Sequence, residues 1–195
     1  MGYNVVREVS AGSVPVFQNV IENAQGGFTL DTTGSDTGSV VPAGSVMGID
    51  EATRKAKPLK VATVYEDATN VATDLKLKKG HLLIVGSVVA AVIGGKAYAV
   101  TVLDTTNAAY DVITVGTTLG VALTAGDAIF ESSATGAAVA ALKVTPSGLL
   151  FQDVKSGVNE PVAVVLRATV YERRIPVVPT AVKALLPNII FSKSF

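Results

Sequence analysis

Apolar and polar residues alternate along several short stretches of this chain. In residues 59–65, Leu59, Val61, Thr63 and Tyr65 fall at every second position and share one face. In residues 74–78, Leu75 and Leu77 alternate with charged residues, so the leucines are expected to point inward and the lysines outward. Successive side chains of an extended chain point to opposite faces, so this period of two predicts β-strands.

Apolar runs between turn signals predict further strands. Residues 81–85 form a continuous apolar run of the kind found in strands buried on both faces. Gly94 and Gly95 separate residues 88–93 from residues 98–103, and paired glycines accept the positive φ of a tight turn, which predicts a hairpin. The other predicted strands lie in residues 45–50, 110–115, 117–123, 128–131 and 161–171. Turn signals recur about every eight to twelve residues, a spacing typical of barrels and sandwiches.

The two ends of the chain have a different character. Residues 1–39 combine short apolar patches with a polar, turn-rich run, and predict an extended N-terminal arm. Near the C-terminus, two prolines keep residues 176–179 extended, Thr180 is a fair N-cap for a short helix over residues 180–186, and residues 188–191 read as a strand-like tail. Residues 132–141 fit either a short helix or a loop with a strand.

These patterns predict a mainly β protein: a compact β-barrel or β-sandwich with an extended N-terminal arm and a short C-terminal helix plus tail. The predicted division is an arm over residues 1–39, a β-rich core domain over residues 40–172, and a Pro-rich segment, helix and tail over residues 173–195.

Composition limits the chemistry that the chain can perform. Hydrophobic residues make up 49% and charged residues 16% of the sequence, with no cysteine, no tryptophan, one histidine and no formal net charge. Disulfides and thiolate metal sites are excluded, and nucleic acid or anionic lipid is not an expected partner without a basic surplus. Neither a secretory signal nor an apolar run of about 20 residues that could span a membrane is visible. Low charge beside many small apolar residues favours a surface covered by copies of the chain or by a partner.

Few residues carry the candidate chemistry, and each has a simpler structural explanation. The single His81 has no nucleophile in a recognisable context, so a structural or partner-contacting role is expected. An acidic turn from Asp31 to Asp36 does not match a calcium loop. Gly94-Gly95-Lys96 lacks the rest of a phosphate-binding loop, and Arg173-Arg174 is expected to form salt bridges at a rim. Four carboxylates could form a hydrolytic pair, although most lie at turns: Asp104, Asp111, Asp127 and Glu131. We therefore predict no catalytic, cofactor-binding or metal-binding residues.

An ordered set of segments resembles the head fibre and head decoration proteins of tailed bacteriophages. The set comprises residues 41–50 (Val-Pro-Ala-Gly-Ser-Val-Met-Gly-Ile-Asp), 58–65, 78–81, 110–120 and 181–191. The resemblance covers most of the chain from Val40 onward. It implies a β-rich protein, often trimeric, that attaches to the outside of an assembled capsid and is not an enzyme. The sequence shows no long fibre shaft, which favours a compact knob or an anchoring piece.

The function expected from these observations is that of a structural virion protein, made in the bacterial cytoplasm and placed on the capsid exterior. Its expected partners are copies of itself, with a trimer favoured, and the major capsid protein. The expected contact residues lie in the apolar stretches 14–17 and 189–191, which a monomer would have difficulty burying. Two alternatives stay open. One is a carbohydrate-binding or adhesin-like module that uses Tyr65, Tyr98 and Tyr110; the other is a hydrolase that uses Asp111 and Glu131.

Overall fold

The computed structural model describes residues 15–24 and 27–194, and predictions that fall on residues 1–14 or 25–26 lie outside this part. The fold is mainly β, as predicted. Its strands are β1 (Phe17–Asn23), β2 (Phe28–Leu30), β3 (Val40–Val41), β4 (Val46–Asp50), β5 (Lys55–Pro58), β6 (Val61–Thr63), β7 (Asp74–Lys78), β8 (Val88–Ala90), β9 (Ala97–Asp104), β10 (Tyr110–Val115), β11 (Ala128–Glu131), β12 (Gly148–Leu150), β13 (Val154–Lys155), β14 (Pro161–Val162), β15 (Val164–Tyr171) and β16 (Ile189–Ser192). The helices are a 3₁₀ turn η1 (Glu172–Arg174) and α1 (Thr180–Lys183).

Strands from both ends of the chain form one curled sheet, which we call the base barrel. Its order is β1-β15-β12-β4-β5-β2-β14, with β16 parallel to β15. Only Ala163 separates β14 from β15, so the path from β15 through β12, β4, β5 and β2 returns to its start. The closed path surrounds one apolar cluster: Phe28, Leu30, Val41, Met47, Ala56, Leu150, Val154, Val162 and Val164.

Residues between β5 and β12 form a second sheet, which we call the second barrel. Its order is β6-β11-β8-β9-β10-β7. The backbone N–H of Tyr65, just after β6, donates to the carbonyl of Lys76 on β7 at 2.8 Å, and this bond brings the two edge strands together. Leu75 and Leu77 lie inside with ten other buried apolar side chains, as their alternation predicted.

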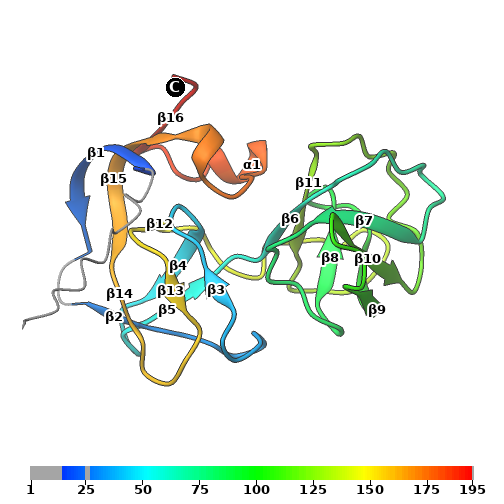
Figure 1. Cartoon of the computed structure of the whole chain (residues 1–195), viewed down its shortest axis with the longest axis horizontal. Coiled ribbons are helices and arrows are strands. Elements are labelled where there is room, and N and C mark those ends of the chain that lie inside the picture. Colours follow the sequence, from blue (N-terminus) through cyan, green and yellow to red (C-terminus); the bar gives the residue numbers. More distant parts are fainter. Residues whose placement is uncertain (1–14, 25–26, 195) are drawn as a thin grey trace, which may run out of the picture.

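The second barrel is an insertion into the base barrel, and the two lie side by side (Figure 1). This arrangement differs from the predicted division. Residues 40–172 do not form one core, because β5 and β14 pair with β2 of the predicted arm, β15 pairs with β1 of the arm and β16 of the tail, and β6 to β11 make a separate sheet. In the predicted arm, β1 pairs along β15 and β2 pairs with β5 and β14.

The C-terminal segment covers the outer face of the base barrel (Figure 1). Val182, Leu186 and Ile189 pack against Val46, Leu149, Val165 and other residues of the sheet. Neighbouring residues of β15 therefore face different clusters, Val164 inward and Val165 toward the C-terminal segment. The strand-like tail is confirmed, and so is the short helix, although it ends at Lys183 and Thr180 is its first residue rather than its N-cap.

Two predicted strands are loops in the structure, and the open question of residues 132–141 is answered. In residues 81–85, the backbone N–H of Leu83 donates to His81 Nδ1 and that of Ile84 to Ser87 Oγ, so side chains replace strand partners. Residues 117–123 form only one isolated bridge, although Leu119 and Leu123 are buried. Residues 132–141 form a loop with isolated bridges.

The predicted hairpin is confirmed, because β8 pairs antiparallel with β9 and Gly94 has a φ of +76°.

Candidate functional site

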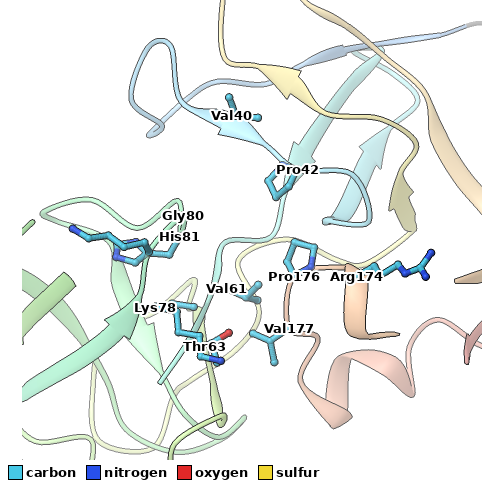
Figure 2. Close-up of a pocket in the computed structure, with 12 residues that line it drawn as sticks. Val40, Pro42, Val61, Thr63, Lys78, Gly80, His81, Arg174, Pro176 and Val177 are labelled. Carbon is cyan, nitrogen blue, oxygen red and sulfur yellow. The ribbon is translucent and has the colours of Figure 1, made fainter. Parts of the chain in front are cut away.

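A crevice of about 430 Å³ lies between the two barrels and includes the predicted site residues His81 and Arg174 (Figure 2). Its walls are largely apolar and come from both barrels and from the Pro-rich segment. They include Val40, Pro42, Val61, Pro176 and Val177. Its polar lining consists of Thr63, Lys78, Lys79, His81 and Arg174. The crevice could accept an anion only if the cationic groups turned toward its centre.

His81 does not face a reaction centre. Its Nδ1 accepts the N–H of Leu83 at 3.2 Å, so the neutral ring carries its proton on Nε2. Nε2 points to Asp111 Oδ2 at 3.4 Å, and Asp111 also pairs with the ammonium of Lys79. Burial lowers the pKa of His81, and the opposing effect of the Asp111 charge is smaller. His81 therefore lies as a neutral ring between its loop and β10; its buried Nε2 makes no hydrogen bond, and no hydroxyl in the described residues bonds to the ring.

Arg174 is also occupied elsewhere. Its guanidinium stacks over the Tyr171 ring at 4.4 Å and donates to the carbonyl of Pro15 at 2.9 Å. Figure 2 shows the side chain turned away from Val61 and Thr63. The crevice thus has cationic residues at its rim without a convergent anion site.

A buried charge cluster joins the two connectors between the barrels. Lys60 is 2% exposed and its ammonium reaches the carbonyl of Gly34 in the acidic turn of residues 31–36. Glu131 is equally buried; its Oε1 accepts a bond from Lys143 at 2.8 Å, and its backbone N–H donates to the Lys60 carbonyl at 2.9 Å. Burial lowers the pKa of Lys60, and the Glu131 charge opposes this effect. The cluster fixes the junction, and Lys60 was missed as a structural residue. Its one signal was a lysine within an otherwise apolar stretch, residues 58–62.

The four carboxylates considered for hydrolysis are not paired across a cleft. Asp104 accepts the N–H of Thr106, and Asp127 accepts that of Thr124, each within its own turn. Asp111 and Glu131 have the lysine partners described above. Each carboxylate therefore has a local structural role.

The acidic turn has no metal-binding geometry. Asp31 Oδ1 accepts the N–H of Thr33 at 3.0 Å, and Asp31 Oδ2 lies 3.6 Å from the ammonium of Lys57. Across residues 15–24 and 27–194, no group of three or more Asp, Glu or His side chains is placed to hold a metal ion.

The two predicted contact stretches meet on either side of Val170. Phe17 is its partner on β1 and Phe191 its partner on β16, and both side chains pack against the cluster that the C-terminal segment forms with the sheet. Val14 lies outside the described residues. Ile189 is 5% exposed, so the expectation that a monomer would not bury this stretch is wrong for that residue, whereas Ile190 is 63% exposed.

Two of the three tyrosines considered for sugar binding also come together. The rings of Tyr65 and Tyr110 have centroids 5.1 Å apart, whereas Tyr98 packs against the interior cluster of the second barrel.

Comparison with protein-family models, with curated proteins and with solved structures finds no match. Within the described part of the chain, no helix combines the length and the apolarity that crossing a membrane requires.

Proposed function

We propose that this chain is a structural virion protein that decorates a bacteriophage capsid, or anchors fibres on it, through protein–protein assembly. The observation that supports this most is the pair of sheet edges beside β15. In the part of the chain that the structure describes, β1 and β16 each pair with β15 alone. Ile21 on β1 is 60% exposed and Ile190 on β16 is 63% exposed. Open edges that carry large apolar side chains suit strand addition by another chain.

The resemblance noted in the sequence supports the same function. Residues 41–50 and 181–191 lie far apart in the sequence, and both carry the resemblance. In the base barrel, Val46 from the first segment shares a core with Val182 and Ile189 from the second. The proposed partners are copies of the chain, as a trimer, and the major capsid protein.

Light scattering coupled to size exclusion tests the trimer at micromolar concentration. We expect a mass three times that of one chain. A monomer at that concentration would contradict the trimer.

Co-sedimentation with empty capsids of the parent phage tests attachment. Ile21→Lys and Ile190→Lys place charges on the two open edges and are expected to abolish co-sedimentation. Val158→Lys is the matched control, because Val158 is 88% exposed in the β13–β14 loop, away from β1 and β16. If both edge variants bind as tightly as the control, the two edges are not the attachment surface.

A further inference from the structure

Tyr65 and Tyr110 form an aromatic pair on the outer face of the second barrel. Tyr65 follows β6 and bonds through its backbone to Lys76 on β7, and Tyr110 is the register partner of Lys78, also on β7. The two ring centroids lie 5.1 Å apart with 36° between the planes. Tyr65 is 40% exposed, so a ligand can reach its ring.

A shallow polar cavity of about 260 Å³ adjoins this pair. Its polar lining consists of Glu66, Asp67, Thr69, Asp74 and Lys76. Glu66 follows Tyr65 in the sequence. The Lys76 ammonium lies 2.7 Å from Glu66 Oε2 and 5.2 Å from the Tyr110 ring centroid. Lys76 therefore connects the aromatic pair and the cavity into one surface.

The cavity keeps hydrogen-bond acceptors directed to solvent. Asp67 Oδ1 accepts the N–H of Ala125 at 2.8 Å, and Asp74 Oδ1 accepts the hydroxyl of Thr114 at 2.7 Å. These bonds fix both carboxylates on the barrel. Among the described residues nothing donates to the second oxygen of either one, so both Oδ2 atoms can accept from a ligand.

Charge excludes anionic ligands from this cavity. Three carboxylates and one ammonium leave the cavity with a net negative charge, which repels phosphate, sulfate and nucleic acid. Lys76, paired with Glu66 and lying over Tyr110, already fills the position between carboxylate and ring that a ligand cation would take. The exposed Tyr65 ring beside free carboxylate oxygens favours a neutral molecule with an apolar face for the ring and a rim of hydroxyl donors for the carboxylates. A pyranose sugar has this shape.

We propose that this surface binds a neutral carbohydrate. A pyranose ring stacks on the exposed ring of Tyr65, which Tyr110 supports from its other side, and its hydroxyl groups donate to Glu66, Asp67 and Asp74. The site is separate from the edges of the base barrel, and it stands whether or not the chain assembles on a capsid.

Affinity electrophoresis in native gels tests the site, with dextran, laminarin or galactomannan cast into the gel and polygalacturonate as the anionic comparison. We expect at least one neutral polymer to slow the wild-type chain by about twofold or more. Tyr65→Ala and Tyr110→Ala should lose this retardation, and Tyr65→Phe should keep it because the ring remains. Phe151→Ala is the matched control, since this exposed aromatic residue lies on the base barrel and its loss should change nothing.

Glu66→Gln keeps the experiment decisive if an alanine variant fails to fold. Glu66 has a side chain 58% exposed, so the change leaves the barrel intact but removes a charged acceptor, and retardation should weaken. The proposal is overturned if none of the three neutral polymers slows the wild-type chain, if only polygalacturonate does, or if folded Tyr→Ala and Glu66→Gln variants are slowed as much as the wild type.

Discussion

At the scale of single residues, His81 makes stability depend on pH in a range where few other groups titrate. It is the only histidine, and burial lowers its pKa below the ordinary value of 6.5. The unfolded chain therefore takes up a proton near pH 6.5, while the folded chain does so only at lower pH. The contribution of neutral His81 to the free energy of unfolding is fully present above pH 6.5. It is lost as the pH drops through the folded pKa, with a slope of at most about 1.4 kcal/mol per pH unit.

Urea unfolding at pH 7.0, 6.25 and 5.5 measures this effect. Wild type should lose free energy of unfolding toward pH 5.5. His81→Gln should not, because glutamine can still accept from Leu83 and donate toward Asp111 without titrating. Parallel pH profiles for the two proteins would show that His81 titrates alike in both states.

Gly48 is required at its position for space rather than for backbone freedom. A Cβ atom there would lie 2.3 Å from Val144 Cγ1 and 2.6 Å from the carbonyl oxygen of Thr145. We expect Gly48→Ala to destabilise the fold by about 1–3 kcal/mol. Gly116→Ala is the control, since its nearest neighbour would be Thr101 Cγ2 at 3.7 Å, and its effect should stay within about 0.5 kcal/mol. Equal effects in thermal unfolding would contradict the steric argument.

At the scale of elements, the C-terminal segment is part of the folded body. Val182 on α1 is fully buried against the base barrel, whereas Leu185, one turn later, is 50% exposed. Val182→Ala should therefore lower the free energy of unfolding by about 1–3 kcal/mol. Leu185→Ala should lower it by less than about 1 kcal/mol. If denaturant titration gave the two variants equal losses, α1 would not be packed on the barrel in solution.

Alternation predicts strands well where one face is buried and neighbouring strands agree. Leu75 and Leu77 show this on β7, and so do Val162 and Val164 on β14 and β15, all of which are buried. Around β6, by contrast, Ala62 and Val64 are buried while Tyr65 is exposed, so the inward face is not the one that carries Val61, Thr63 and Tyr65. The period of a single strand does not state which face meets the core, because the pairing partners decide that.

Local sequence also does not reveal where a side chain, rather than a neighbouring strand, accepts a backbone N–H group. The apolar run of residues 81–85 has the composition of a buried strand, yet His81 and Ser87 accept the backbone N–H groups that strand partners would otherwise bind. The same limit applies to the candidate site. Tyr65 and Tyr110 were named as separate aromatic residues, and only the pairing of β10 with β7 brings their rings together.

At the scale of the whole molecule, the insertion could not be predicted because its evidence is non-local. The base barrel closes through β4 with β12 and β2 with β14, pairs that lie about a hundred residues or more apart in the sequence. Turn signals recur at similar intervals in both barrels, so nothing in the pattern marks where one sheet ends and the other begins. Lys60, Glu131 and Lys143 mark that junction; Lys60 and Glu131 are buried in it, whereas the Lys143 side chain stays 40% exposed.

Separate cores predict that the base barrel folds without the second barrel. The Glu131 backbone bonds both Lys60 and Lys143, so the two ends of the insertion lie about two strand spacings, roughly 10 Å, apart. A four-residue Gly-Ser linker spans that distance and can replace residues 61–142.

The shortened chain should unfold cooperatively at a lower temperature than the full chain, because it loses Val61 and Leu142 from the edge of its core. It should keep the stoichiometry of the full chain in light scattering, since β1 and β16 remain, and should lose any retardation by polysaccharide. Absence of a cooperative transition would mean that the two barrels form a single folding unit.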